Sequence, residues 1–374
     1  MKVLLVGAGG YGTIYANTLL KNTDPSISWE GVVDNNFSAC SKRAEIEAAG
    51  IPAYATMEEF YTERTADLVL ICTPPFLHRE QSIYALSHGS YVMCEKPVAP
   101  TVEDAEAMLS AERKYGKWIA VGYQWSYERQ MQELKRDIKS GALGKPISFK
   151  TAVSWPRDLA YYGRGSGWAG RIKRDGITIL DSIASNACAH YLHNMLFLLG
   201  DDMDTSAEAE ELCACCLRAN DIESFDTCSI KAAANGVSLY LVASHAAEKR
   251  KDPEFIYRFE DATVTYTESE GIELKAIFQD GRVKSYGELA RHGAQKIWDC
   301  IDAIKNGTVP ICTVKTAAPH TRLVKRIYEK VPVCNFPEEL IVFDENEKRV
   351  WVKGLYEKMY KAYEREEMLT YPNK

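Results

Sequence analysis

Apolar runs and segments of helical spacing alternate through the first third of the chain. Five runs are short and nearly continuous in apolar residues, which is typical of parallel strands buried on both faces of a sheet, and Tyr54 marks a sixth, shorter strand. The five runs are Lys2–Val6, Trp29–Val33, Asp67–Cys72, Tyr91–Cys94 and Trp118–Val121. Segments of helical periodicity lie between them, over about 37–49, 77–87 and 101–115. The alternation predicts a doubly wound parallel sheet that binds ligands beyond the carboxyl ends of its strands.

The pattern changes after about Tyr123. Residues 147–155 alternate between apolar and polar side chains, the period of a half-exposed strand, and Asn235-Gly236 and Asp280-Gly281 are strong signals for hairpin turns. Helices are expected over about 181–199, 292–306, 317–330 and 355–366, and a strand over 340–343. We therefore expect residues 1–123 to form the first domain. Residues 124–374 should form a C-terminal α/β domain with an open, mostly antiparallel sheet and helices on one side.

A glycine-rich turn joins the first strand to the first helix. Gly7 permits the tight turn, Gly9 leaves the backbone open to a pyrophosphate, and Gly12 lets the helix pack closely on the sheet. The helix then directs unpaired N–H groups and its positive dipole end at the phosphates. The cofactor contacts expected here are Gly7, Gly9, Gly10, Tyr11 and Gly12. Because the flanking strands and helix agree with this pattern, we predict dinucleotide binding rather than a purely structural turn.

The second strand ends at Asp34, 22 residues beyond Gly12. A carboxylate at this position can accept hydrogen bonds from both ribose hydroxyls and would repel a 2′-phosphate. Its neighbours Asn35 and Asn36 supply no positive charge to hold such a phosphate. We therefore expect NAD as the cofactor, with NADP disfavoured.

Composition excludes several classes of function. The formal net charge of −7 at pH 7 argues against nucleic-acid partners, and no apolar stretch approaches the length that crosses a bilayer. The apolar N-terminus is five residues long and leads into the glycine turn, unlike a secretory signal. Eleven scattered cysteines suit reduced thiols in a cytoplasmic protein. Cys213 and Cys216 form a CxxC pair, but they lie in an apparent buried strand with no second ligand pair, so no metal site is expected.

The first candidate for the chemistry is Glu95-Lys96-Pro97, which follows a parallel strand. A lysine there points out of the sheet edge toward the nicotinamide end of a bound cofactor. From its position alone, a surface lysine with no role is an equal alternative.

The second candidate is the predicted helix of residues 181–199. Asn186, His190 and His193 are spaced i, i+4 and i+7, so they share one face of a continuous helix whose other face is apolar. A single histidine on such a helix is usually structural, whereas two histidines and an amide on one face favour a functional site. No carboxylate or cysteine ligand stands at a useful spacing from the pair, so zinc is not expected.

The third candidate is the irregular segment 156–176, which is rich in arginine and aromatic residues. Guanidinium groups beside aromatic rings suit a sugar face or an anionic substituent. Trp168 and Arg171 are therefore expected to contact the substrate. The alternative is a surface loop whose charges pair with solvent and with neighbouring acids.

Four motifs together resemble those of the Gfo/Idh/MocA oxidoreductases, a family named after glucose-fructose oxidoreductase and inositol dehydrogenase. They are GAGGYG at 7–12, CTPPFLH at 72–78, HGSYVMCEKP at 88–97 and VGYQWSY at 121–127. The resemblance covers the first 150 residues and continues through the helix that ends at Gly200. It implies a Rossmann domain followed by an open-sheet α/β domain, and NAD(P)-dependent oxidation or reduction of sugars, cyclitols or related alcohols. The remaining cofactor contacts expected on this basis are Asn35, Thr73, Pro74, His78, Glu95, Lys96 and Gln124.

The resemblance also implies roles for the catalytic residues. Lys96 would hydrogen-bond the reacting oxygen, and His190 would take the hydroxyl proton as hydride leaves for the nicotinamide. The chain departs from the family at Asn186, where an acid is usual, and at His193, where a second acid is common. Asn186 can orient the substrate hydroxyl but carries no charge. We therefore expect a more positive site than usual, suited to an acidic or phosphorylated substrate that Lys96, Asn186, His190 and His193 contact.

The leading expectation is an NAD-dependent dehydrogenase or reductase of a small sugar-like alcohol. It would be a cytoplasmic protein that binds neither nucleic acid nor membrane and assembles as a homo-dimer or homo-tetramer. Two alternatives stay open. One is a redox-neutral glycosidase that uses bound NAD for transient oxidation. The other is a non-catalytic, cofactor-binding regulatory protein, an alternative that the replacement of the usual acid by Asn186 favours.

Overall fold

Two compact units make up the protein. In the computed structural model the described residues are 1–164, 167–267, 273–290 and 293–371. The first unit consists of Met1–Tyr127 and His292–Ala318, and the second of Glu128–Arg291 and Pro319–Lys374. The sequence-based division at residue 123/124 differs from these units, because residues 292–318 return to the first one.

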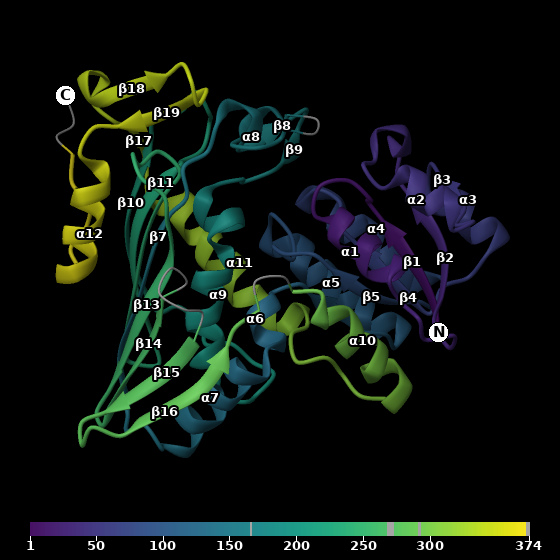
Figure 1. The fold of residues 1–374 in the computed structure, drawn as a ribbon, viewed down its shortest axis with the longest axis horizontal. Helices are drawn as coiled ribbons and strands as arrows, with labels where there is room; N and C mark the ends of the chain where they lie inside the picture. The colour runs from purple at the N-terminus through teal and green to yellow at the C-terminus, as the bar shows by residue number, and fades with distance from the viewer. Residues whose placement is uncertain (165–166, 268–272, 291–292, 372–374) are drawn as a thin grey trace. The chain divides into compact units, whose positions relative to one another are not determined.

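The first unit is built on a six-stranded parallel sheet with the strand order β3-β2-β1-β4-β5-β6 (Figure 1). The strands are β1 Lys2–Val6, β2 Ser28–Val33, β3 Ala53–Tyr54, β4 Leu68–Ile71, β5 Tyr91–Cys94 and β6 Ile119–Val121. Every pairing among them is parallel. The chain starts at the centre, runs to one edge and then crosses to the other side, so the strand order reverses beyond the carboxyl ends of β1 and β4. The predicted doubly wound sheet is confirmed.

Helices connect these strands, and most of them lie where the apolar spacing predicted; the helices at 57–63 and 124–127 were not predicted. They are α1 Gly12–Leu20, α2 Arg43–Ala48, α3 Met57–Glu63, α4 His78–Ser87, α5 Val102–Tyr115, α6 Gln124–Tyr127 and α10 Gln295–Asn306. Two 3-10 turns, Phe37–Ala39 and Pro75–Leu77, complete the connections. The expected helix over 37–49 is divided, because the extended backbone of Cys40 separates the first of these turns from α2.

Apolar packing explains why residues 292–318 belong to the first unit. Ile297 and Ile301 of α10 are buried in the same core as Leu5 of β1 and Leu70 of β4. Beyond α10 the chain runs along β6, where the carbonyl of Cys312 accepts a hydrogen bond from the backbone N–H of Val121 at 2.8 Å. The parallel sheet is thereby extended at its β6 edge by a segment from the later part of the chain.

A nine-stranded sheet dominates the second unit, with the strand order β16-β15-β14-β13-β7-β12-β11-β10-β17 (Figure 1). The strands are β7 Pro146–Ser154, β10 Glu211–Arg218, β11 Thr227–Ala234, β12 Val237–Ser244, β13 Lys251–Phe259, β14 Ala262–Thr267, β15 Glu273–Phe278, β16 Val283–Glu288 and β17 Val333–Asn335. Two pairings, β7 with β12 and β10 with β17, are parallel and the others are antiparallel. The predicted mostly antiparallel sheet is therefore confirmed. Asn235 and Gly236, both with positive φ, form the predicted hairpin turn between β11 and β12.

Helices cover both faces of this sheet, so the prediction of helices on one side only is wrong. The helices are α7 Arg129–Ser140, α8 Leu159–Gly163, α9 Ala189–Leu198, α11 Val314–Lys330, which runs across the boundary between the units, and α12 Leu355–Arg365. The Thr151 hydroxyl contacts Met195 of α9, whereas the ammonium group of its neighbour Lys150 donates to the carbonyl of Tyr363 in α12. Adjacent residues of a strand point to opposite faces, so α9 and α12 lie on different sides.

Short elements complete the second unit. They are the two-stranded ribbons β8 Lys173–Arg174 with β9 Ile177–Thr178 and β18 Ile341–Asp344 with β19 Arg349–Val352, a π-helix at Ile183–Ala187 and a 3-10 turn at Glu338–Leu340. Within the described ranges, no helix combines the length and apolarity that spanning a bilayer requires.

Candidate active site

The glycine turn after β1 leaves an open approach to the start of α1. Gly7 has a φ of +84°, and a Cβ on Gly12 would lie 2.0 Å from the Gly7 carbonyl oxygen, so both positions require glycine. A Cβ on Gly9, in contrast, would meet no atom within 4 Å. No side chain caps the first turn of α1. The turn therefore offers exposed backbone at Gly9 and Gly10, at the N-terminus of a helix, which is where a pyrophosphate binds in such folds.

Asp34 stands beside this turn at the end of β2. One carboxylate oxygen accepts a hydrogen bond from the backbone N–H of Ala8 at 2.9 Å, and the other accepts from Asn36 at 2.8 Å. The carboxylate is thus fixed next to the glycine turn, while Asn35 is exposed. A negative charge at this point suits ribose hydroxyls and repels a 2′-phosphate.

His78 braces the loops that follow β4 and β5. Its side chain is 0% exposed, and its two ring nitrogens lie 2.9 Å from the carbonyl oxygens of Thr73 and Pro97. Burial lowers the pKa of His78 below its ordinary value, although the two carbonyls act in the opposite direction. This environment is that of a supporting residue. Thr73 and Pro74, which are partly exposed, are the better-placed members of this motif for contact with a ligand.

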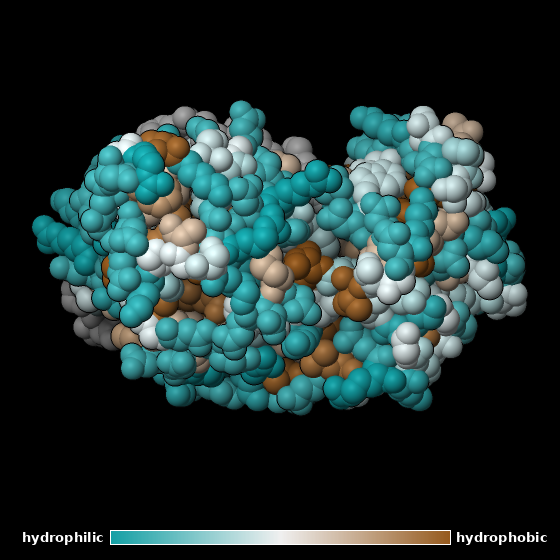
Figure 2. All heavy atoms as spheres, turned by 90° about the horizontal axis from the view of Figure 1, so that it is seen from below, coloured by the Kyte–Doolittle hydropathy of each residue, from teal (hydrophilic) through white to brown (hydrophobic). Residues whose placement is uncertain are grey.

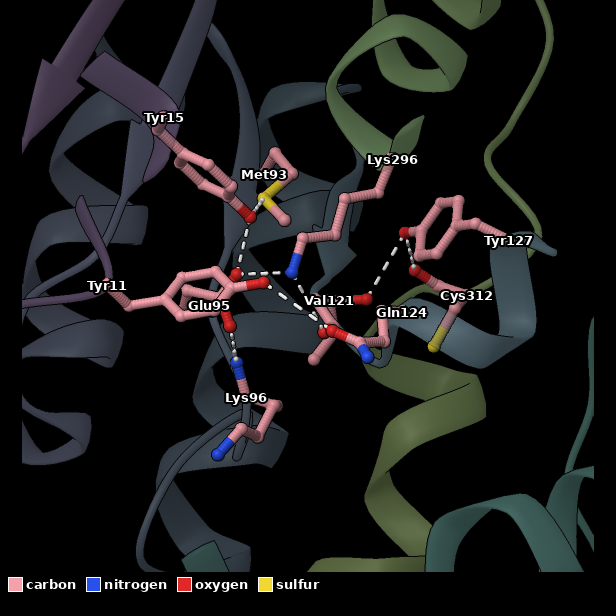
Figure 3. A network of polar contacts seen from close by, with 11 residues as sticks. Tyr11, Tyr15, Met93, Glu95, Lys96, Val121, Gln124, Tyr127, Lys296 and Cys312 are labelled. Atoms are coloured by element: carbon pink, nitrogen blue, oxygen red, sulfur yellow. Dashed lines mark hydrogen bonds and ion pairs between the residues drawn. The ribbon is translucent and has the colours of Figure 1, made fainter. Parts of the chain in front are cut away.

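Glu95, expected to contact the cofactor, instead lies at the centre of a buried polar network (Figure 3). One of its carboxylate oxygens accepts hydrogen bonds from the Tyr15 hydroxyl and from the ammonium group of Lys296, the latter at 2.5 Å. The other accepts from the backbone N–H of Lys96 at 3.2 Å. A Cβ on Gly122 would lie 2.8–2.9 Å from this carboxyl group, so glycine leaves the room that Glu95 occupies.

Lys296 gives this network its charge balance. Burial alone would raise the pKa of Glu95, but the positive charge and hydrogen bond of Lys296, together with the Tyr15 hydroxyl, hold it below its ordinary value. Burial would likewise lower the pKa of Lys296, and Glu95 reverses that effect, so both side chains are charged. The Lys296 side chain is 0% exposed, and its ammonium group lies 4.9 Å from the centre of the Tyr11 ring.

Sequence reasoning missed Lys296 and Tyr15. A usable signal existed for Lys296, because it lies on the buried face of α10 with Ile297, Cys300 and Ala303, where a lone lysine needs a partner. Gln124 had been expected at the cofactor, and its side-chain oxygen lies 3.5 Å from the Tyr11 hydroxyl on the glycine turn.

Lys96 occupies the position expected from the sequence, immediately beyond the carboxyl end of β5. Its side chain is partly exposed, and it precedes a cis peptide bond to Pro97. Figure 3 shows its amine on the side away from the Glu95 carboxylate, with only the backbone N–H turned toward that group. The side chain therefore projects from the sheet edge where ligands of such sheets bind.

In the second unit, the predicted helix over 181–199 is interrupted. A π-helical turn, Ile183–Ala187, begins at a cap formed by Ser182 and Ser185, and α9 starts only after Cys188. The expected alignment of Asn186 with His190 and His193 assumed a continuous α-helix, so that spacing argument does not hold across Cys188. Asn186 and His190 are each partly exposed.

Asp181 supplies a carboxylate beside Asn186. One of its oxygens accepts a hydrogen bond from the Asn186 amide at 2.9 Å, and the other accepts from the backbone N–H of Gly170 at 2.7 Å. Asp181 is only 6% exposed. A carboxylate therefore stands beside Asn186, so the uncharged side chain at this position no longer argues by itself for an acidic or phosphorylated substrate.

His193 is part of the core of the second unit. It is 1% exposed, and its ring stacks on Phe197 at 5.9 Å. Burial, followed by the nearby His320 and Lys135, holds the pKa of His193 well below its ordinary value. The side chain is therefore neutral and packed, which is the structural environment that a single histidine on such a helix usually has.

The arginine-rich segment 156–176 is only partly as expected. Arg171 forms an ion pair with Glu223 at 2.9 Å. For this residue the structure therefore agrees with the alternative interpretation, in which the charges of the loop pair with neighbouring acids. The guanidinium group of Arg164 lies 3.5 Å from the centre of the Tyr161 ring and 5.1 Å from that of Trp168. Residues 165–166 lie outside the described residues.

No metal site is found in the part of the chain that the structure describes: it contains no group of three or more His, Cys, Asp or Glu side chains arranged to hold an ion. Cys213 and Cys216 both lie on β10. Residues three apart on a strand point to opposite faces, so this pair cannot chelate one ion.

Comparisons with known proteins agree with this architecture. Residues 1–123 match the model of the Gfo/Idh/MocA family, described as an oxidoreductase family with an NAD-binding Rossmann fold. The inositol 2-dehydrogenase of Renibacterium salmoninarum is 32% identical over 153 residues, which are 41% of this chain and 45% of that protein. The D-glucoside 3-dehydrogenase of Escherichia coli is 28% identical over 146 residues, which are 39% of this chain and 41% of that protein. The matches thus span less than half the length of these curated relatives.

Solved structures extend the likeness of fold to most of the chain. The WlbA dehydrogenase from Bordetella pertussis, solved with NADH and UDP-GlcNAcA, has a TM-score of 0.71 at 21% identity, covering 88% of this chain and 95% of that one. The aldose-aldose oxidoreductase from Caulobacter crescentus has a TM-score of 0.72 at 18% identity, covering 88% and 96%. Residues 1–123 therefore match the NAD-binding Rossmann fold of the Gfo/Idh/MocA oxidoreductases, and the solved structures show the same fold over most of the chain.

Proposed function

We propose that this protein is an NAD-dependent oxidoreductase that transfers a hydride between nicotinamide and a hydroxyl-bearing carbon of a sugar, cyclitol or sugar-acid-like molecule. The observation that carries the proposal lies in the first unit. The open glycine turn, Asp34 and Lys96 all stand at the carboxyl ends of strands of one parallel sheet. The named relatives that match this region, an inositol dehydrogenase and a glucoside dehydrogenase, support the substrate class.

Residues of the first unit would bind NAD and stabilise the reacting oxygen. The backbone of Gly9 and Gly10 and the start of α1 hold the pyrophosphate, and Asp34 holds the adenosine ribose. Lys96 donates a hydrogen bond to the reacting oxygen and stabilises the negative charge that develops there. NAD, when bound, supplies the hydride acceptor or donor.

The second unit would contribute His190 as the group that takes the hydroxyl proton. Asn186 would orient the substrate through its side-chain oxygen, since its amide N–H already donates to Asp181 at 2.9 Å. Asp181 fixes this amide and brings a negative charge near it. Neutral polyols and sugars are therefore included among the substrates that we propose.

A substrate panel tests the proposal. Sugars, glycosides, cyclitols and sugar acids are incubated separately with NAD⁺ and NADP⁺, and the formation of NADH or NADPH is followed by absorbance. We expect NADH to accumulate with at least one polyol or sugar, and NADP⁺ to be a poor substitute. Release of an aglycone without NADH would instead identify a redox-neutral glycosidase. Tight NAD binding without any turnover would identify a regulatory protein.

We further propose a cytoplasmic location and a homo-oligomeric state. The eleven cysteines are all free, which supports a reducing compartment. Ile277 on β15 and Val283 on β16 are 41% and 61% exposed, which supports self-association through that end of the second sheet. Light scattering of the purified protein measures the oligomeric state.

A further inference from the structure

The buried carboxylate of Glu95 has two lysines within its reach. Lys96 is its neighbour in sequence, and Lys296 comes from α10, 201 residues further along the chain. Both act on Glu95 electrostatically, Lys296 more strongly than Lys96. A buried carboxylate is unstable without a positive partner, so one of the two ammonium groups must balance it.

Among the residues that the structure describes, the other ionisable groups that act on Glu95 cannot balance its charge. They are Tyr11, Tyr15, Cys72, His78, Cys94, Tyr123 and Tyr127. Burial raises the pKa of each of these hydroxyls and thiols and lowers the pKa of the histidine, so all are neutral near pH 7. Within the described part of the chain, the choice of partner therefore lies between Lys296 and Lys96.

In the structure, Lys296 makes the direct ion pair with Glu95, and the charge of Lys96 acts on it more weakly. The Lys296 ammonium group contacts the carboxylate at 2.5 Å and also donates to the Gly122 carbonyl at 3.2 Å. The Lys96 amine lies on the far side of its own backbone from the carboxylate (Figure 3). The hydrogen bond from the Lys96 backbone to Glu95 leaves the carboxylate very close to the lysine that the proposed reaction needs.

We propose that Lys296 is a positioning residue: by neutralising Glu95, it keeps the Lys96 ammonium group directed away from the carboxylate and into the site. This inference rests on the proposed function, because it assigns Lys96 to the reaction. Without the charge of Lys296, the Glu95 carboxylate attracts the Lys96 side chain inward. The lysine would then be withdrawn from the substrate although every residue that binds NAD is unchanged.

Selective labelling of Lys96 tests the proposal without any need for turnover. The full-length protein without cofactor is treated with an amine-specific reagent, and mass spectrometry gives the labelling rate of the peptide that contains Lys96. The variants are Lys296→Met, which removes the charge, and Lys296→Gln, which keeps hydrogen-bond donors for Glu95 and Gly122. Lys150→Met is the matched control, because Lys150 is also a buried lysine near a glutamate, Glu366 at 3.8 Å, but lies in the second unit.

We expect both Lys296 variants to slow the labelling of Lys96 by about tenfold, as one unit of pKa would. The double variant Glu95→Gln/Lys296→Met should restore the wild-type rate, because it removes the attracting carboxylate as well. Lys150→Met should leave the rate unchanged. If Lys296→Met does not fold, Lys296→Gln and the double variant still decide the question.

Two readouts separate a positioning role from a purely structural ion pair. With a substrate in hand, the Lys296 variants should lower kcat while leaving the Kd of NAD⁺ unchanged, and the double variant should recover kcat. Unchanged labelling of Lys96 in both Lys296 variants would overturn the proposal, as would slow labelling that persists in the double variant. If labelling follows the prediction but no substrate of the panel is oxidised, the proposed function fails and the charge relation between the two lysines stands.

Discussion

Ionisation of the Glu112 carboxyl group should make the first unit less stable as the pH rises. Its carboxyl group lies on α5, largely buried, and accepts a hydrogen bond from the backbone N–H of Ile119 at 2.7 Å. Burial raises the pKa of Glu112 from 4.5 to about 7, although the hydrogen bond from Ile119 and the charge of Arg113 act in the opposite direction. The folded unit therefore holds a proton that the unfolded chain releases.

The sign and size of the effect follow from this difference. Between pH 4.5 and 7 the unfolded chain binds fewer protons at Glu112 than the folded chain does, so stability falls as the pH rises and levels off above pH 7. A difference of about 2.5 pKa units corresponds to about 3 kcal/mol of the free energy of unfolding, and about 2.5 kcal/mol of this is lost between pH 5 and pH 8.

The variant Glu112→Gln removes the titration and keeps an oxygen that can accept from Ile119. Urea unfolding at pH 5 and pH 8, followed by tryptophan fluorescence, gives the free energy of unfolding of each protein, and Trp118 lies next to Ile119 as a reporter. The free energy of unfolding that the variant gains over the wild type should be about 2.5 kcal/mol larger at pH 8 than at pH 5. Glu106→Gln, an exposed glutamate on the same helix, should show no such difference. A gain for Glu112→Gln that is equal at the two pH values would refute the reasoning.

Three further predictions concern single residues. Gly9→Ala should fold normally, because its Cβ meets no atom within 4 Å, yet weaken NAD⁺ binding by about tenfold or more in calorimetry, since the methyl group takes the place of the pyrophosphate; equal affinity would contradict this. Asp34→Ala should raise the Kd of NAD⁺ by about 10–100-fold, because the charged hydrogen bonds to the ribose are lost. It should also reduce the preference of the protein for NAD⁺ over NADP⁺, and an unchanged ratio of the two Kd values would count against a role of Asp34 in selecting NAD⁺. His193→Gln should lower the melting temperature but leave KM unchanged, because His193 is 1% exposed and packed on Phe197; a raised KM with full stability would show that it contacts substrate.

The parallel sheet could be predicted almost completely from the sequence. Runs such as Leu68–Ile71 are buried on both faces and read as continuous apolar stretches, and Gly12 is required by the close approach of the Gly7 carbonyl. These features are local in the chain. The antiparallel sheet could be predicted for a similar reason, since Asn235-Gly236 encodes its hairpin directly.

The parts that could not be predicted depend on contacts between distant residues or on a small change of helical register. Lys296 is paired with a carboxylate 201 residues away, and nothing in its own helix identifies Glu95 as the partner. The π-helical turn before Cys188 shifts the phase of the helix, so the contact between Asn186 and Asp181 could not be predicted from the spacing of a regular helix. The covering of the second sheet face by α12 likewise arises from residues such as Met359 and Tyr363, whose apolar spacing predicts a helix but not the surface it covers.

The central claim, hydride transfer with Lys96 and His190 as catalytic residues, is tested most directly by turnover of NAD⁺ in two variants. Lys96→Ala and His190→Ala are compared with the wild type on the best substrate of the panel, with the Kd of NAD⁺ measured alongside. We expect each variant to lose about 100-fold or more in kcat while the Kd of NAD⁺ changes little, because positioned proton transfer and stabilisation of the reacting oxygen contribute rate rather than cofactor affinity. If either variant turned over at the wild-type rate, that residue would have no part in catalysis and the account would be contradicted.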